Sequence, residues 1–243
     1  MVAFKRSPML KNIDAVILCG GLGKRLRSVI GASQKTMADF NGHPFLMFVL
    51  NHLKNQGIRR LIFCTGFKAR DIENYFKRNN LGLKIEFSRE KKPLGTGGAL
   101  KLAKSLIQSD HFFVLNGDSF CPLSLNALSR YHMKRKALAT LAVLKVNDIR
   151  DFGAVVLDRK GKITHFIEKG KVKRKLTVNA GVYCLSQKIF SLMPRRMKFS
   201  LEYDCFPDLM NKNFFGFKVR QKFFDIGTPE RFKYAQTVFK NRT

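Results

Sequence analysis

Short apolar runs that alternate with helical patterns constrain the fold of the first half of this chain most strongly. The runs Ala15–Cys19 and Leu61–Thr65 each stop at a glycine, as buried parallel strands do. Two further strands are expected at Lys84–Ser88 and Phe112–Leu115. Between them, apolar residues recur at helical spacing, as in Phe45–Leu53, and a glycine-rich turn at Gly95–Gly98 is expected to lead into a further helix. This alternation predicts an α/β fold with a largely parallel sheet and right-handed crossovers.

The second half is richer in closely spaced strands. They are expected at Ala139–Lys145, Ala154–Leu157, Ile163–Ile167 and Val178–Leu185. Thr228 as N-cap and Pro229 at the first helical position predict a last helix that reaches about Val238. No linker rich in Pro, Gly or Ser interrupts the 243 residues, so we expect a single domain with halves of about 1–120 and 121–243.

The charge of the chain is strongly unbalanced. It has 46 Lys and Arg against 17 Asp and Glu, a formal net charge of +29. Such a balance attracts polyanions, whether nucleic acid, anionic membrane or phosphorylated small molecules. The basic residues are scattered from Lys5 to Arg242, with a dense run only from Lys169 to Lys175. This scatter argues against nucleic acid as a partner and favours a solvated basic surface.

The cysteine pattern and the hydropathy of the chain indicate the cellular compartment in which the protein is expected. The five cysteines are odd in number and have no Cys-x-x-Cys spacing, so the sequence predicts neither a disulfide framework nor a zinc site. The apolar run near the N-terminus is interrupted by Asp14 and ends at Gly20. It is too short for a signal peptide or for a membrane span of about 20 residues. We expect a cytoplasmic protein without a membrane span.

A glycine cluster directly after the first strand is the sharpest local motif. Gly20, Gly21 and Gly23 allow close approach of a ligand to the backbone, and consecutive N–H groups there can cradle an anion. Arg25 adds a planar cation suited to phosphate oxygens. The motif is neither a Walker A loop nor the dinucleotide fingerprint. Taken alone it fits a plain tight turn equally well, although Lys35 downstream supplies a second cation.

Two aspartates are expected at strand ends. Asp118 follows the fourth strand, at the edge where open α/β sheets bind ligands. Asp225 lies at a later strand end, before Gly227. Two such carboxylates could hold Mg²⁺, which commonly uses one or two carboxylates together with substrate phosphates. A lone carboxylate at such a place is often a helix cap, and the sequence alone does not bring the two together.

With these motifs in register, the chain resembles the sugar-1-phosphate nucleotidyltransferases, most of all their heptose 1-phosphate and mannose-1-phosphate guanylyltransferase branches. The resemblance runs from about Ile13 to Gln236 and implies a Rossmann-like three-layer fold. The motifs, in chain order, are GGLGKRLRSV, Lys35, NGHPFL, PLGTGGAL, LNGDSF, Glu168-Lys169, NAGVYCLS and FFDIGTPERF.

The resemblance also implies a role for each matching residue, with nucleoside triphosphate and sugar 1-phosphate as substrates. The catalytic residues implied are Arg25, Lys35, Asp118 and Lys169. Those implied to bind the nucleotide, in the first half, are Leu18, Gly20, Gly21, Gly23, Glu90, Gly95, Thr96, Gly97 and Gly98. Those implied to bind the sugar, in the second half, are Gly153, Glu168 and Asn179. Asp118 and Asp225 are implied as the ligands of Mg²⁺.

The sequence departs from the family pattern around Lys35, where relatives usually have flanking prolines and this chain has Gln34 and Thr36. We therefore expect a more mobile loop. Each of these residues also has a purely structural interpretation. Lys35 would be a surface lysine, Glu168 and Lys169 would form a salt bridge, and Gly153 and Asn179 would be turn or cap residues. Two alternative functions also stay open: transfer of a uridylyl, thymidylyl or cytidylyl group, and a catalytically silent relative that binds nucleotide or nucleic acid. The chain could also form a homo-oligomer.

Overall fold

The structure is a computed structural model, and it describes residues 10–146, 154–167 and 176–239. The strands are β1 (Ala15–Leu18), β2 (Asp39–Phe40), β3 (His43–Pro44), β4 (Arg60–Thr65), β5 (Lys84–Arg89), β6 (His111–Asn116), β7 (Ser119–Phe120), β8 (Ala139–Val146), β9 (Ala154–Leu157), β10 (Ile163–Ile167), β11 (Leu176–Ser186), β12 (Phe214–Lys218) and β13 (Phe224–Asp225). The α-helices are α1 (Arg27–Ile30), α2 (Phe45–Asn55), α3 (Ala69–Arg78), α4 (Gly95–Leu102), α5 (Leu125–Lys134) and α6 (Pro229–Phe239). Short 3₁₀ turns lie at Leu10–Asn12, Lys24–Leu26, Lys35–Met37, Ala103–Leu106, Gln187–Leu192 and Pro207–Leu209, and a π-turn lies at Leu201–Cys205.

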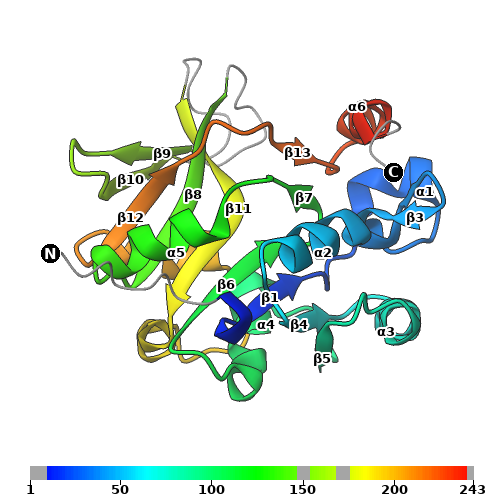
Figure 1. The fold of residues 1–243 in the computed structure, drawn as a ribbon, viewed down its shortest axis with the longest axis horizontal. Coiled ribbons are helices and arrows are strands. Elements are labelled where there is room, and N and C mark those ends of the chain that lie inside the picture. The colour runs from blue at the N-terminus through cyan, green and yellow to red at the C-terminus, as the bar shows by residue number, and fades with distance from the viewer. Residues whose placement is uncertain (1–9, 147–153, 168–175, 240–243) are drawn as a thin grey trace, which may run out of the picture.

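A nine-stranded sheet forms the centre of the fold (Figure 1). Strands β6, β1, β4 and β5 lie side by side and are all parallel. Alternate residues of β1 face opposite layers: Ile17 belongs to the core that includes Val49 of α2, and Val16 to the core that includes Leu100 of α4. The predicted α/β architecture, with a mainly parallel central sheet between helices, is confirmed.

The second half extends the same sheet with antiparallel strands. β11 pairs antiparallel with β6 and with β8, and β12 adds parallel to β8. Gly181 lies in the left-handed region at φ +67°, where the register of β11 against β8 shifts. Helix α5, for which we made no sequence prediction, begins after Ser124, whose side chain accepts a hydrogen bond from Ala127 N at 3.2 Å.

One local prediction needs correction. The segment Gly95–Gly98, expected as a turn that leads into a helix, is itself the first turn of α4. The glycines serve close packing there rather than chain reversal, as described below. In the part of the chain that the structure describes, no helix could cross a membrane, and all five cysteines are buried free thiols.

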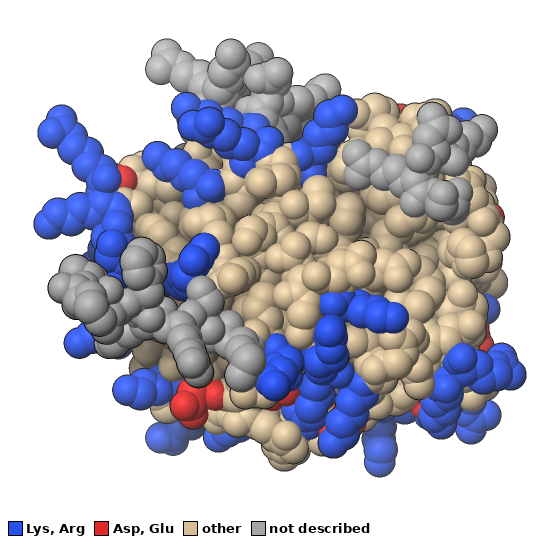
Figure 2. Space-filling view, viewed as in Figure 1, with Lys and Arg blue, Asp and Glu red and all other residues tan. Residues whose placement is uncertain are grey.

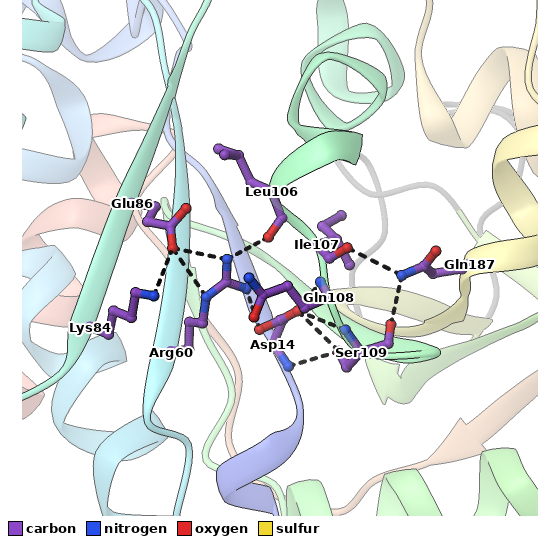
Figure 3. A network of polar contacts seen from close by, with 9 residues as sticks. All are labelled: Asp14, Arg60, Lys84, Glu86, Leu106, Ile107, Gln108, Ser109 and Gln187. Atoms are coloured by element: carbon purple, nitrogen blue, oxygen red, sulfur yellow. Dashed lines mark hydrogen bonds and ion pairs between the residues drawn. The ribbon is translucent and has the colours of Figure 1, made fainter.

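A buried polar network fastens the amino ends of the parallel strands (Figure 3). Asp14, just before β1, lies 2.6 Å from the Arg60 guanidinium of β4. Its other carboxylate oxygen accepts hydrogen bonds from the N–H groups of Gln108 and Ser109, before β6, at 2.6 and 3.0 Å. Arg60 also reaches Glu86 of β5 at 2.9 Å. One cluster therefore ties together the four strands whose opposite ends carry the candidate site.

We predict that Asp14→Ala destabilises the protein by about 3–5 kcal/mol, because it leaves the Arg60 charge buried without its main partner. Asp14→Asn keeps an acceptor and should destabilise less. Urea unfolding followed by circular dichroism measures both changes. Asp71→Ala, which breaks the exposed Lys68–Asp71 pair at 3.9 Å, is the control and should change stability by under about 1 kcal/mol. A loss below about 1 kcal/mol for Asp14→Ala would contradict the prediction.

A buried histidine predicts how stability depends on pH. Burial, and then the neighbouring His111, lowers the pKa of His132 from 6.5 to about 4. The unfolded chain therefore takes up this proton near pH 6.5, whereas the folded chain takes it up only near pH 4. Stability should be complete above pH 6.5 and should fall by roughly 3 kcal/mol as the pH drops to 4. His132→Gln should flatten this part of the curve; an unchanged slope between pH 6.5 and 4 would rule out His132 as its source.

Candidate active site

A cavity of about 460 Å³ opens at the carboxyl ends of β1, β4 and β6. The structure gathers most of the residues predicted from the sequence around it. Those that line it are Leu18, Gly20, Gly21, Gly23, Arg25, Lys35, Glu90, Gly95, Thr96 and Asp118. Since these residues come from five separate segments, the cavity is a product of the fold rather than of one motif.

Two glycines of the loop after β1 allow close contact with neighbouring residues. Gly23 has φ +58°, and a Cβ built there would lie 3.0 Å from the Cβ of Lys35. A Cβ on Gly20 would lie 2.8 Å from a carboxylate oxygen of Glu90. Gly21 differs, because nothing lies within 4 Å of the Cβ position. The loop can therefore come close to Lys35 and Glu90 while its exposed middle faces the cavity.

Glu90 is wedged at the end of β5 between two glycines. One carboxylate oxygen accepts a hydrogen bond from Leu94 N at 3.0 Å. The other lies against Gly20 and Gly66, where added Cβ atoms would be 2.8 and 2.5 Å away. Burial raises the pKa of Glu90, and the hydrogen bond from Leu94 opposes that shift. The result is a fixed, partly desolvated carboxyl group in the wall of the cavity.

The four residues Gly95–Gly98 divide into two pairs. Gly95 and Thr96 line the cavity, although a Cβ on Gly95 would also lie 2.6 Å from Phe199 O, whereas Gly97 and Gly98 pack against residues 197–199 without lining the cavity. A Cβ on Gly97 would lie 2.2 Å from the Phe199 ring, and one on Gly98 would lie 2.1 Å from a backbone oxygen. Both N–H groups donate to Phe199 O, at 3.0 and 3.1 Å. Gly97 and Gly98 therefore hold α4 in place and do not reach the cavity.

The structure brings Asp118 and Asp225 together. Asp225 is paired with Ser119 in the antiparallel ladder of β13 and β7, and Ile226 N donates to Asp118 O at 3.1 Å. Burial, followed by the negative charge of Asp118, raises the pKa of Asp225, while Lys35, the Gly227 N–H and Arg231 act in the opposite direction. These carboxylates therefore affect each other, although of the two only Asp118 lines the cavity.

Each of these carboxylates already has a cationic partner. Lys35 Nζ lies 2.7 Å from Asp118 Oδ2, and Arg231 Nη1 lies 2.6 Å from Asp225 Oδ1. Among the described residues, no group of three or more His, Cys, Asp or Glu could by itself hold a metal ion. A cation bound at the aspartate pair would thus need further ligands from a substrate or from water.

Hydrogen bonds take the place of the missing prolines around Lys35, where we expected a more mobile loop. Gln34 and Thr36 are both only 2% exposed. The Gln34 amide donates to Cys19 O at 2.6 Å, and its oxygen accepts from the N–H of Thr36 at 2.6 Å and of Met37 at 3.2 Å. Gln34 therefore caps the turn that carries Lys35 and fastens it to the end of β1.

Asn179 does not line the described cavity, but a polar chain connects it to the lining residue Thr96. Asn179 donates to the Tyr183 hydroxyl at 2.8 Å, which donates to Glu202 at 3.0 Å. The other Glu202 oxygen accepts from the Thr96 hydroxyl at 2.7 Å. Burial, and then Glu202, raises the pKa of Tyr183. Thr96 at the cavity is thus connected to β11 through Glu202 in the π-turn.

Three sequence-predicted residues, Gly153, Glu168 and Lys169, lie outside the described residues. Sequence reasoning missed two residues that contact predicted site residues, Arg231 beside Asp225 and Glu202 beside Thr96. Arg231 could have been found, because a helix that starts at Pro229 puts it in the first turn after Asp225. Glu202 carries no local signal, since its partner Thr96 is more than one hundred positions away.

Comparisons with known proteins agree with this geometry. The family model described as nucleotidyl transferase matches residues 14–241. A D-glycero-alpha-D-manno-heptose 1-phosphate guanylyltransferase from Aneurinibacillus thermoaerophilus is 37% identical over 92% of this chain and 97% of that protein. The enzyme of the same name from Campylobacter jejuni is 39% identical over 90% of this chain and 96% of its own length.

A solved structure extends the likeness to three dimensions. HddC from Yersinia pseudotuberculosis, complexed with GMP-PN, superposes with a TM-score of 0.82 at 36% identity, covering 94% of this chain and 100% of that one. The family model and both relatives span nearly the whole sequence. This chain therefore belongs to the nucleotidyl transferase family, among sugar-1-phosphate nucleotidyltransferases.

Proposed function

We propose that this chain is a guanylyltransferase that joins GTP to D-glycero-α-D-manno-heptose 1-phosphate and releases pyrophosphate. The observation that carries the proposal is the meeting of the glycine loop, Lys35 and Asp118 around one cavity, with Asp225 beside Asp118. The two heptose guanylyltransferases at 37% and 39% identity give the substrates their names. The GMP-PN complex of HddC supports a guanine nucleotide.

The chemistry needs positioned charges rather than a general base. An oxygen of the sugar phosphate is already a competent nucleophile and attacks the α-phosphorus in line, so that pyrophosphate leaves. Arg25 and Lys35 offset the charge of the triphosphate, and the loop N–H groups hold it. No histidine is assigned a part in the reaction. Catalysis then consists of orientation and of stabilising the charge on the transferring and leaving groups.

A divalent metal ion, as nucleotidyltransferases of this family generally use, fits the aspartate pair, and we propose Mg²⁺. Asp118 and Asp225 offer hard oxygen ligands, and their mutual repulsion favours a cation between them. When bound, the ion would neutralise charge on the phosphates of the nucleotide. Ion pairs with Lys35 and Arg231 hold the two carboxylates in place.

We predict that Asp118→Asn and Asp225→Asn each fold and lose Mg²⁺-dependent turnover by roughly 100-fold or more, because each removes a charged oxygen ligand. Pyrophosphate release from GTP with a panel of sugar 1-phosphates measures the effect, and circular dichroism confirms folding. Asp71→Asn, an exposed aspartate of α3, makes the same charge change elsewhere and should keep full turnover. Full activity in either site variant would refute its metal role.

The division of labour follows the halves of the chain. We assign the nucleotide to residues up to about 120 and the sugar phosphate to the remainder, including Asn179 and the undescribed Gly153, Glu168 and Lys169. Lys169 would contact the sugar phosphate and Glu168 the sugar hydroxyls. Mannose 1-phosphate is the alternative acceptor. Because the five cysteines are unpaired thiols, we place the enzyme in the cytoplasm.

Glu90 is our candidate for recognition of guanine. Its carboxyl group is held in the cavity wall by Leu94 N and by the two flanking glycines. Guanine presents two adjacent donors, the ring N–H and the exocyclic amine, and a carboxylate presents two acceptors in the same spacing. Uracil and thymine offer one such donor, and cytosine lacks the adjacent pair. A fixed acidic group therefore favours guanine over the other bases.

We predict that Glu90→Gln lowers kcat/KM for GTP by about 10- to 100-fold, because the amide places a donor against a guanine donor. The preference for GTP over inosine triphosphate, which lacks the exocyclic amine, should shrink in the variant. Steady-state kinetics with both nucleotides gives the two ratios.

Glu73→Gln is the matched control for this change, since Glu73 lies on α3 outside the cavity lining. Its GTP kinetics should stay within about twofold of wild type. An unchanged GTP-to-inosine-triphosphate ratio in Glu90→Gln would remove Glu90 from base recognition. Turnover confined to UTP or dTTP would contradict guanylyl transfer itself.

A further inference from the structure

A second hollow lies at the edge of the sheet opposite the candidate active site. Its volume is about 640 Å³, and its lining includes Lys136, Leu138, Ser186, Lys188, Lys212 and Asn213. Ser186, at the end of β11, pairs with His111, the first residue of β6, whereas the candidate active site lies at the last residue of β6. At about 3.3 Å per residue, the length of β6 separates the two cavities by roughly 17 Å. We refer to this feature as the lysine hollow.

The lysine hollow collects positive charge without acidic partners. Its three lysines come from the end of α5, from the segment after β11 and from the segment before β12. Within the described ranges, none of the three forms an ion pair. Figure 2 shows that basic side chains are spread over the visible face of the molecule and that acidic ones are few. What distinguishes the hollow from this general surface is the concave arrangement.

The backbone holds the lining firmly. Leu138 N donates to Asn213 O at 2.8 Å, and Ser186 N donates to Leu138 O at 2.9 Å. The side-chain amide of Asn213 donates to Lys136 O at 3.2 Å. The starts of β8 and β12 and the end of β11 are therefore fixed relative to one another, and the three lysines extend from a rigid frame.

Lys136 has an unfavourable backbone conformation for a lysine. It follows α5 with φ +47°, in the left-handed region that glycine and asparagine favour at helix ends. Its N–H donates to Met133 O at 3.0 Å, which closes the helix end. A glycine would close the same turn without the steric penalty of a Cβ. Lys136 is thus found at a position where the backbone conformation favours glycine.

We propose that the lysine hollow binds a small anion that carries two or more phosphate groups. Lysines from three segments can surround one anion, and the oxygens of an oligophosphate can accept hydrogen bonds from all three ammonium groups. Ser186 and Asn213 add polar groups to the lining. The site is separate from the proposed transferase reaction, so it stands or falls independently of it.

The test uses inorganic tripolyphosphate with the full chain in the absence of metal. Titration followed by amide resonances locates the bound anion, because shifts at Ser186, Lys188 and Asn213 report the hollow and shifts at Gly20–Gly23 report the candidate active site. The combined variant Lys136→Gln, Lys188→Gln and Lys212→Gln should weaken binding at the hollow by at least tenfold. It should keep GTP turnover, since none of the three lines the catalytic cavity.

Two single variants separate a built site from a general field of positive charge. Lys136→Gly should weaken tripolyphosphate binding several-fold and at the same time raise Tm, because it removes both the charge and the left-handed strain. Lys134→Gln removes a charge of the same helix that does not line the hollow and should weaken binding less than twofold. Absence of shifts at the hollow, or equal losses for Lys134→Gln and Lys136→Gly, would overturn the proposal.

Discussion

The candidate active site depends on a two-residue antiparallel ladder between β7 and β13. It holds Asp118 and Asp225 together although they are more than one hundred positions apart in the chain. So short a ribbon is not stable by itself, and aromatic packing supports it. The ring of Phe239 in α6 lies 5.0 Å from that of Phe224 and 5.8 Å from that of Phe120, one from each strand. The geometry of the two carboxylates is therefore set by a hydrophobic cluster beside them, not by their own interaction, which is repulsive.

That repulsion explains why the surrounding cations are so closely arranged. Two neighbouring carboxylates, one of them largely buried, are unfavourable unless positive charge accompanies them. Lys35 and Arg231 supply it from opposite ends of the chain. Lys35 can do so only because Gln34 fixes its turn against the end of β1. One oxygen of each carboxylate is thus engaged by an ammonium or guanidinium group in this structure.

The sequence predicted those features of the fold that short-range residue patterns determine. Buried runs such as Ala15–Cys19 mark parallel strands because both faces are covered, and parallel strands align their carboxyl ends, so Asp118 could be assigned to the ligand edge. Long-range packing escaped prediction. Gly97 and Gly98 were expected to form a turn, yet they lie in α4, and glycine is needed there because residues 197–199 leave no room for a Cβ. Likewise, the loss of prolines beside Lys35 predicted a mobile loop. The hydrogen bond from the Gln34 amide to Cys19 O could not be predicted, because it depends on how the fold places Cys19 beside Gln34.

The polar chain from Thr96 through Glu202 and Tyr183 to Asn179 joins the two halves of the molecule. Buried networks of this kind stiffen the elements that they connect, because breaking any hydrogen bond leaves a desolvated polar group without a partner. Thr96 lies in α4 at the proposed base pocket, and Asn179 lies in β11 on the proposed sugar side. A shift of β11 that accommodates a different sugar would therefore strain the link to α4. The buried hydrogen bonds therefore join a residue of the proposed base pocket to a residue of the proposed sugar side.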